Sequence, residues 1–301
     1  MYHFPELKYP FDGSKKLADF STNYTAGITD KALARRVLGK EREKLFDLQH
    51  TLFSDGRYSL LVILQAMDGA GKDSTIRHVM SGINPVGCLV KSFKAPSEEE
   101  LRHDFLWRCS KELPEKGDIG VFNRSYYEDV LIVRVHPEML HNYPFPPSTV
   151  KKPDNEFWKK RFNNIVNFEK HLHHENTHVL KFFLHISKEE QKHRFIKRIE
   201  DPRKNWKFQY ADLREREYWD DYMHAYDEML RYTSTKMAPW YVMPADNKWF
   251  MQMAVCCIIN KKLKSMKLKI PLASEHHKKE LENAMLILSG KAKYSDFENN
   301  S

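Results

Sequence analysis

Residues Tyr58 to Met80 read YSLLVILQAMDGAGKDSTIRHVM, and this stretch decides the fold. It begins with an apolar run from Leu60 to Leu64, which is typical of a strand buried on both faces of a sheet. Gly69 and Gly71 then let the backbone turn tightly, and the residues from Ser74 onward have the character of a first helical turn. The segment therefore predicts a strand, a glycine turn and a helix in direct succession.

The glycine turn is predicted to bind phosphate. Its amide groups and the helix N-terminus offer unpaired N–H groups and partial positive charge, and the ammonium group of Lys72 can reach the outer phosphates of a bound chain. A strand-to-helix turn without a ligand, with a solvated lysine, is the alternative. Besides Lys72, the expected phosphate or nucleotide contacts in this turn are Gly69, Ala70, Gly71, Asp73 and Ser74.

The turn departs from the P-loop pattern G-x-x-x-x-G-K-[ST] at two positions. Ala66 stands in place of the first glycine, and Asp73 stands in place of the hydroxyl residue that binds metal. Asp68 and Asp73 add negative charge to an anion-binding loop, which is reasonable if Mg²⁺ lies between carboxylate and phosphate oxygens. Each has a second explanation, because Asp68 can bond to its own turn and Asp73 can stabilise a helix N-terminus.

The composition is that of one large α/β domain with extensions. The chain has 301 residues, of which 41% are hydrophobic, and 49 basic against 41 acidic residues give a net charge of +8. The excess of positive charge indicates a polyanionic partner. Because basic and acidic residues are interspersed, the chain has no basic tail. The four cysteines show no paired metal-ligand spacing, which favours reduced thiols and a cytoplasmic location. We expect no export signal and no membrane span.

Predicted strands and helices alternate along the chain. Strands are expected at Gly87–Phe93, Asp118–Asn123, Thr177–Ile186 and Trp240–Met243 in addition to the first one. Helices are expected from Thr29 to about Gly56, from Ser97 through Trp107, from Tyr126, over Asp154–Glu175, from Ser187, over Ala211–Arg231, over Lys248–Lys261 and after Pro271. This alternation predicts an α/β fold with a central parallel sheet that is covered on both faces.

We divide the chain into three parts. Residues 1–55 are expected to form an extended arm followed by a helix. The arm is expected to lie over the domain or across a partner subunit. Residues 56–265 are expected to form the phosphate-binding core, with a lid at about 195–215. Residues 266–301 are expected to form a C-terminal helix and a frayed tail.

A second part of the site is expected after the strand Asp118–Asn123. Its polar end, Asn123-Arg124-Ser125, falls at the carboxyl edge, where open parallel sheets bind ligands. Arg124 is predicted to bind phosphate, the alternative being a pair with a local carboxylate. Glu128 either completes a capping box with Ser125 or faces a metal or acceptor.

The segment Arg194 to Phe208, RFIKRIEDPRKNWKF, is densely basic. Arg194 and Arg198 fall on one helical face, and Lys204 and Lys207 follow the break at Pro202. The pattern predicts a lid that closes over a polyanion; a solvated basic loop is the alternative.

Four segments together resemble the family-2 polyphosphate kinases. They are AMDGAGKD (66–73), FNRSYYEDVLIVRVHPE (122–138), RFIKRIEDPRKNWKF (194–208) and TSTKMAPWYVMPADNKW (233–249). The resemblance implies a three-layer α/β/α P-loop kinase fold, similar to thymidylate kinase, with a helical lid. It implies that Ala66 and Asp73 are the family's own form of the loop, and it places Arg134 among the phosphate or nucleotide ligands.

The same resemblance implies reversible transfer of a phosphoryl group between inorganic polyphosphate and a nucleotide, with Mg²⁺ required and Mn²⁺ able to substitute. Asn123 stands where some members carry Asp, and Tyr126-Tyr127-Glu128 follows. This resembles the subgroup that accepts nucleoside monophosphates and diphosphates, so we expect ADP and AMP as acceptors, guanine nucleotides as further candidates, and a homo-oligomer, dimer or tetramer.

Phosphoryl transfer needs positioning and charge neutralisation. The expected catalytic residues are Asp68, Lys72, Asn123, Arg124 and Glu128, with Asp68 and Asp73 as metal ligands. An ATP-dependent nucleoside monophosphate kinase of the thymidylate kinase type is the alternative function. A nucleic-acid-binding protein is not expected, because the aromatic residues are not interleaved with basic ones as in known binding modules.

Overall fold

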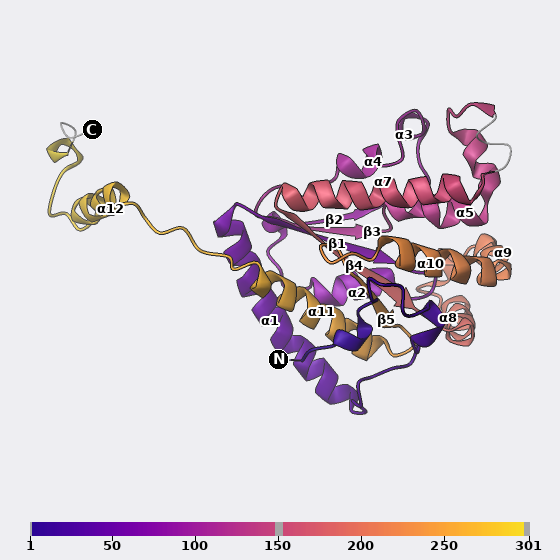
Figure 1. Ribbon diagram of the computed structural model, residues 1–301. Coiled ribbons are helices and arrows are strands. Elements are labelled where there is room, and N and C mark those ends of the chain that lie inside the picture. The colour runs from indigo at the N-terminus through magenta and orange to yellow at the C-terminus, as the bar shows by residue number, and fades with distance from the viewer. Residues whose placement is uncertain (1, 148–152, 298–301) are drawn as a thin grey trace. The chain divides into compact units, whose positions relative to one another are not determined.

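The computed structural model describes residues 2–147 and 153–297, and the chain forms two units, Met1–Leu268 and Lys269–Ser301 (Figure 1). In the second unit, α12 (Glu275–Leu288) begins at the N-cap Ser274, whose hydroxyl accepts from His277 N. All its residues are at least partly exposed. Within the described ranges, no helix has the length and apolar character needed to cross a bilayer.

The first unit is organised around a parallel sheet of five strands in the order β2-β3-β1-β4-β5. The strands are β1 (Ser59–Gln65), β2 (Cys88–Ser92), β3 (Ile119–Asn123), β4 (Thr177–His185) and β5 (Trp240–Pro244). Every residue of the central strand β1 is buried, as its apolar run predicts. Leu64 pairs with Asn123, so the ends of β1 and β3 lie side by side.

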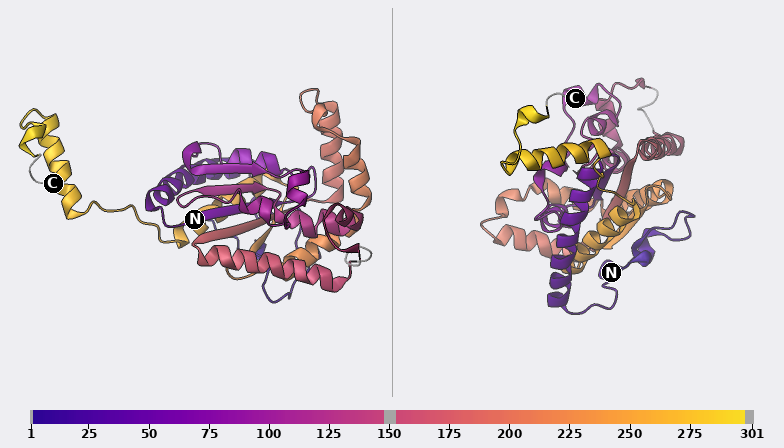
Figure 2. Two further views of the ribbon diagram at one scale, coloured as in Figure 1. Left: turned by 90° about the horizontal axis from the view of Figure 1, so that it is seen from above. Right: turned by 90° about the vertical axis from the view of Figure 1, so that its left-hand side faces the viewer.

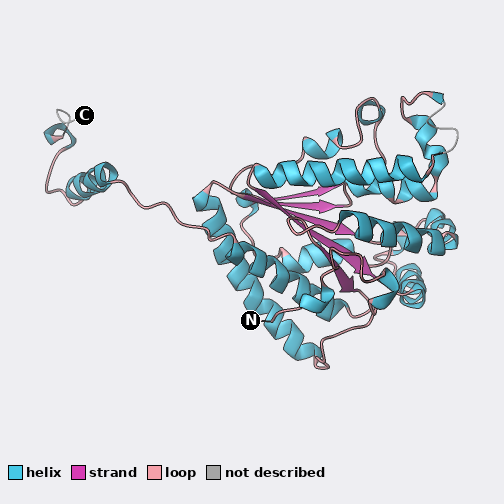
Figure 3. Cartoon of the chain, in the orientation of Figure 1, coloured by secondary structure: helices cyan, strands magenta, loops and turns pink. Residues whose placement is uncertain are grey.

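Helices cover both faces of the sheet, which gives the predicted three-layer α/β/α architecture (Figures 1 and 3). One layer contains α1 (Lys31–Asp55), α2 (Lys72–Val79) and α11 (Lys248–Ser265), and the other contains α7 (Asn155–His174) and α10 (Trp219–Thr233). All strands point toward the end where α8 (Lys188–Glu200) and α9 (Tyr210–Glu217) lie. These two helices stand out from the core as a salmon and orange pair in the left view of Figure 2.

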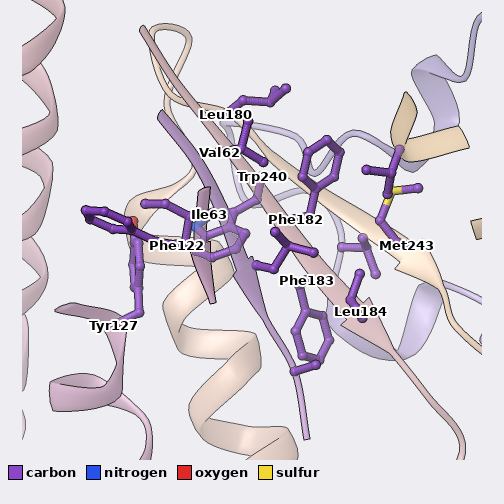
Figure 4. Close-up of a cluster of buried hydrophobic side chains, with 14 of the residues drawn as sticks. Val62, Ile63, Phe122, Tyr127, Leu180, Phe182, Phe183, Leu184, Trp240 and Met243 are labelled. Carbon is purple, nitrogen blue, oxygen red and sulfur yellow. The ribbon is translucent and has the colours of Figure 1, made fainter. Parts of the chain in front are cut away.

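The core lies between the sheet and the two helical layers. Figure 4 shows core side chains from both faces of the sheet: Val62 and Phe182 lie on one face, and Phe122 and Trp240 lie on the other. Each of these four side chains is fully buried. Because strands of a parallel sheet are buried on both faces, successive residues of β1 and β4 are apolar instead of alternating. The rigid sheet fixes the positions of the loops at its carboxyl edge.

The N-terminal arm lies over its own domain, which is one of the two expected arrangements. Tyr9 N donates to the Trp240 carbonyl at 2.9 Å, and Lys8 forms an antiparallel bridge with Tyr241. The arm thereby protects the edge strand β5. The arm contains η1 (Pro5–Leu7) and η2 (Leu17–Asp19) and leads to α1, whose N-cap Asp30 accepts from Ala32 N.

Three predicted helices have different bounds in the structure. Ser97 and Glu100 form a capping box, but α3 (Glu98–Leu101) is only one turn. A separate short helix, α4 (Trp107–Ser110), follows, and Asp104 Oδ1 accepts from the amide of its N-cap residue Leu106. The predicted helix Ala211–Arg231 is two helices, α9 and α10, separated at Tyr218. From Tyr126 the chain forms a 3₁₀ turn, η4 (Tyr126–Val130), before the short α5 (Ile132–Val135) and η5 (Pro137–Asn142).

Candidate active site

The strand, glycine turn and helix are confirmed. Gly71 is the N-cap of α2 with φ of 109°, and Gly69 has φ of 82°. Both values lie in the left-handed region that favours glycine. A Cβ atom on Gly69 would also lie 3.0 Å from Phe195 Cε1 of α8, so the turn is packed tightly against this helix.

Side chains fix the turn by binding its carbonyl groups. Lys72 Nζ donates to Ala66 O at 2.7 Å, and Gln191 Nε2 donates to Asp68 O at 2.8 Å. Arg194 Nη1 donates to the carbonyls of Gly69 and Ala70 at 3.1 and 2.8 Å. The first amides of α2 have no intrahelical partner, so this arrangement presents them to an anion.

Asp68, Lys72, Arg124 and Glu128 form one charge cluster beside the turn. Arg124 Nη2 donates to Asp68 Oδ1 at 3.1 Å, and Lys72 Nζ lies 3.7 Å from the same oxygen. Arg124 has φ of 64°, and its amide donates to Leu64 O, so the backbone at the end of β3 is held in a conformation that is costly for arginine. The sequence prediction that Arg124 faces the same crevice as the turn is consistent with this geometry.

Burial and charge act against each other in this cluster. Burial would raise the pKa of the Asp68 carboxyl, but Lys72 and Arg124 outweigh it and hold the pKa below its usual range. Burial raises the pKa of Glu128, opposed by Arg124 and Lys72. Burial also lowers the pKa of Lys72, opposed by Asp68. Such perturbed groups in a cleft are typical of active sites.

Glu128 faces the cleft and does not close a capping box. Ser125 Oγ accepts from Tyr127 N at 3.2 Å, which is the cap of η4. The Glu128 side chain instead lines the same cavity as Asp68 and Lys72. Of the two roles left open for Glu128, its position favours the one toward metal or acceptor.

Two cavities meet at the turn. The first, the transfer cavity, has a volume of about 670 Å³ and is bounded by the turn, Arg124, Glu128 and residues of α8, α9 and α10. The second, the basic groove, has a volume of about 970 Å³. Its basic residues are Arg77, Arg194, Lys197, Arg198, Arg203, Lys204, Lys207 and Lys248. Asp73 is the only carboxylate among the described residues that line this groove, and Gly69, Asp73, Arg198 and Lys207 line both cavities.

Asn123 contacts the turn through Asp73. Asn123 Nδ2 donates to Asp73 Oδ1 at 2.7 Å and to Ser92 Oγ at 3.3 Å, while its Oδ1 is buried without a hydrogen-bond partner. The pairing of Leu64 with Asn123 produces this contact, because it places the end of β3 beside the start of α2. Asn123 therefore acts on the turn through Asp73 and lies outside the two cavities.

Asp68 and Asp73 are suited to a shared magnesium ion. Both provide hard oxygen atoms, both line the transfer cavity, and the pKa of Asp68 is lowered, so it is ionised. No group of three or more His, Cys, Asp or Glu within residues 2–147 and 153–297 is arranged to hold a metal ion. Mg²⁺ is commonly bound by one or two carboxylates together with substrate phosphates, and these two residues fit that pattern.

Two predicted ligands have other contacts in the structure. Arg194 is mostly buried and binds the carbonyls of Gly69, Ala70, Ala245 and Asp246, so its guanidinium holds the turn in place. Arg134 pairs with Glu228, lies 5.1 Å from the Trp158 ring centroid, and lines a separate cavity. Both guanidinium groups are thus engaged within the protein, although Arg194 still lines the basic groove and Arg134 lies outside it.

The sequence interpretation missed several residues of the site. Arg77 and Lys197 line the basic groove, and both lie on predicted helices. Arg77 is one turn after Asp73-Ser74, and Lys197 is next to Arg198, so these positions could have indicated their roles. Lys248 comes from the start of α11, and no local pattern links it to the turn. No sequence pattern indicated four further residues of the transfer cavity, which are Gln191, Asp212, Glu215 and Arg216.

Comparisons with known proteins agree with the geometry. The family model Polyphosphate kinase 2 (PPK2) matches residues 28–271. An ADP-polyphosphate phosphotransferase of Rhodopseudomonas palustris is 52% identical over 81% of this chain and 84% of its own length. An AMP/ADP-polyphosphate phosphotransferase of Meiothermus ruber is 41% identical over 86% and 92%. The crystal structure of polyphosphate kinase 2 from Arthrobacter aurescens TC1 is similar with a TM-score of 0.84, 39% identity, and coverage of 94% of this chain and 96% of that one.

Proposed function

The chain belongs to the polyphosphate kinase 2 family, and we propose that it transfers phosphoryl groups reversibly between inorganic polyphosphate and the nucleotides ADP and AMP. One structural observation carries this proposal. The phosphate-binding turn lies where a groove lined by eight basic residues and one carboxylate meets a cavity of mixed charge. A polymer of phosphates and a nucleotide can therefore approach the same turn from two sides.

The basic groove is the proposed polyphosphate site. Eight basic side chains against one carboxylate give a track of positive charge that exceeds the needs of one triphosphate. Arginine binds phosphate with paired donors, and lysine binds it as a point charge. Arg198, Lys204 and Lys207 were predicted for this role, and their place in the groove supports it.

Lys72, Arg124 and Glu128 are the proposed catalytic residues at the transfer point, with Asp68. Lys72 and Arg124 offer positive charge to the transferring phosphoryl group, and they release Asp68 when phosphate oxygens arrive. Asp68 and Asp73 would hold Mg²⁺, or Mn²⁺, which neutralises phosphate charge when it is bound. Burial raises the pKa of Glu128, so its carboxyl group is suited to exchange a proton with an acceptor phosphate.

The acceptor nucleoside has a proposed site in a third cavity of about 230 Å³, which adjoins Arg124 and Glu128. Phe93, Pro96 and Phe105 give it apolar walls, as nucleoside pockets require. A nucleoside bound there would extend its phosphates toward Arg124.

The end of α8, η6 (Asn205–Lys207) and the start of α9 form the proposed lid. Its basic residues repel one another until anionic oxygens neutralise them. We expect hydrogen exchange in residues 199–210 to slow when polyphosphate is added. Exchange that does not respond to polyphosphate would contradict a closing lid and favour a static basic loop.

We also propose a cytoplasmic homo-oligomer. The four cysteines, all within the described residues, are free thiols. Val86, Leu89, Val90 and Phe53 form exposed apolar surface near the edge strand β2, which supports association of copies. Light scattering at several protein concentrations distinguishes a dimer or tetramer from a monomer.

A donor exchange tests the function. Purified protein with Mg²⁺ and ADP or AMP receives either polyphosphate or ATP as donor, and nucleotide products are separated by chromatography. We expect product from polyphosphate with both acceptors. Product from ATP and AMP but none from polyphosphate would instead identify an ATP-dependent nucleoside monophosphate kinase.

A further inference from the structure

A fully buried ion pair lies behind the active site, on the opposite side of the segment that carries Arg124 and Glu128. Lys181 of β4 and Glu169 of α7 are 0% and 2% exposed, and Lys181 Nζ lies 2.6 Å from Glu169 Oε2. Neither residue lines the transfer cavity or the basic groove. The pair is therefore not part of the machinery that contacts substrate.

Every strong contact of this pair leads to η4 or to the end of α10. The other two donors of Lys181 go to Tyr127 OH at 2.9 Å and to Thr233 O at 2.8 Å. Glu169 Oε1 accepts from Tyr126 OH at 2.9 Å and from Tyr127 OH at 2.7 Å. All three hydrogens of the ammonium group and both carboxylate oxygens are thus in use.

Tyr126 and Tyr127 immediately precede Glu128, and Ser125 alone separates them from Arg124. Both tyrosines belong to the 3₁₀ turn η4, and their hydroxyl groups donate to the same oxygen of Glu169. Figure 4 shows Tyr127 among the core residues near Phe122 and Trp240, and both tyrosines are buried. The turn therefore points its tyrosines into the core and Glu128 into the transfer cavity, while Asp129 is bound by Arg161.

A buried ion pair is weak as a source of stability. The cost of removing two charges from water can exceed their attraction, and an apolar pair of similar volume is often equally stable or more so. The pair contributes rigidity instead, because a buried network in which every polar group is hydrogen-bonded holds its residues in one geometry. The segment that it holds needs such support, since Arg124 has φ of 64° and Leu131, after η4, leaves helical geometry with ψ of −86°.

We propose that Lys181 and Glu169 are positioning residues for phosphoryl transfer, which fix η4 through Tyr127 and Tyr126 and thereby hold Arg124 and Glu128 at the transfer point. This inference rests on the proposed function of Arg124 and Glu128. It assigns catalytic importance to a charge pair that touches no substrate. Displacement of a reacting group by about 1 Å can lower the rate about 100-fold.

The test uses Glu169→Gln, which keeps the side-chain shape but removes the charge, and Tyr127→Phe, which removes the link between η4 and the pair. Glu41→Gln is the matched control. Glu41 is 3% exposed and accepts from Asn260 Nδ2 at 2.8 Å, but it joins α1 to α11 and has no contact with η4. The charge-neutral double variant Lys181→Met with Glu169→Gln avoids an unpaired buried charge if a single variant does not fold.

Each variant is assayed well below its Tm, with kcat and KM measured separately for ADP and polyphosphate. We expect kcat to fall about 10- to 100-fold in the Glu169 and Tyr127 variants. The KM for polyphosphate should stay unchanged, because the basic groove does not contact η4. The Glu41 control should keep the wild-type kcat even if its Tm falls as much as that of the Glu169 and Tyr127 variants.

A normal kcat in folded Glu169→Gln and Tyr127→Phe, or in the folded double variant, would overturn the proposal and leave the pair a purely structural one. An equal loss of kcat in the Glu41 control would overturn it as well. A wild-type protein without polyphosphate activity would instead contradict the proposed function itself, so the two failures are distinguishable.

Discussion

Arg194 Nη1 donates a hydrogen bond of 2.8 Å to the carbonyl oxygen of Ala70. The guanidinium continues to Gly69, Ala245 and Asp246, so one arginine joins the phosphate-binding turn to the loop after β5. Its neighbour on the same helical face, Arg198, lies 3.7 Å from Asp212 and faces both cavities. Two arginines one turn apart therefore have different roles.

The first prediction separates these roles. Arg194→Ala should lower the free energy of unfolding by about 1 to 3 kcal/mol, because buried carbonyl groups lose their donor. Arg198→Ala should leave stability unchanged and raise the KM for polyphosphate. Urea unfolding and steady-state kinetics on both variants provide the measurements. Equal stability of the two variants would show that Arg194 does not hold the turn.

The second prediction concerns the positive charges at the transfer point. Lys72→Ala and Arg124→Ala should each lower kcat about 100-fold or more, because each removes a charge that stabilises the transferring group. Circular dichroism and Tm measurements check that the fold remains. A folded variant with near-normal turnover would remove that residue from the proposed catalytic set.

Local patterns in the sequence were sufficient to predict the α/β fold and the phosphate-binding turn. The apolar run of β1, the glycines and Lys72 are adjacent in sequence, so their geometry follows from neighbouring residues. The direction of a side chain on an exposed helix is not local in this way. Arg194 and Arg134 were counted as charges available to substrate, but the Arg194 guanidinium is engaged by distant carbonyls and Arg134 pairs with Glu228.

The sequence pattern also could not predict contacts between elements that are distant in the sequence. Asn123 was expected near the turn, but its bond to Asp73 depends on the register of β1 with β3. Lys248 reaches the basic groove because α11 packs against α2, a tertiary contact that no sequence spacing encodes. Amphipathic patterns predict that a helix is covered, but they do not identify its partner.

The third prediction concerns metal. Asp68→Asn should raise the Mg²⁺ concentration needed for half-maximal activity about tenfold, because it removes one charged oxygen ligand. Mn²⁺ should partly restore activity. The assay is a magnesium titration at fixed polyphosphate and ADP. Full activity of the wild type in excess chelator would contradict a metal role for this turn.

The fourth prediction concerns pH. Burial lowers the pKa of Lys248 to about 8, with Arg194 adding to the effect. Below pH 8 the ammonium form binds phosphate, and above it the neutral amine does not, so affinity for polyphosphate should fall as pH rises through about 8. Lys248→Arg should keep its charge and shift this loss to higher pH. Binding measured between pH 6.5 and 9 checks the direction, and identical profiles would exclude Lys248.

The last prediction concerns Asn123. Asn123→Asp would place a carboxylate where an amide now donates to Asp73 at 2.7 Å, so two negative charges would meet beside the transfer cavity. ADP brings more negative charge to this cavity than AMP does. The ratio of kcat/KM for AMP to that for ADP should therefore rise about fivefold, equivalent to ~1 kcal/mol of added repulsion.

Asn123→Ala is the control for this substitution, since it removes the amide without adding charge. It should loosen Asp73 and lower turnover with both acceptors to the same extent. Both variants are measured with AMP and ADP at fixed Mg²⁺ and polyphosphate. Equal proportional changes for the two acceptors in Asn123→Asp would mean that Asn123 supports the turn through Asp73 but does not discriminate between acceptors.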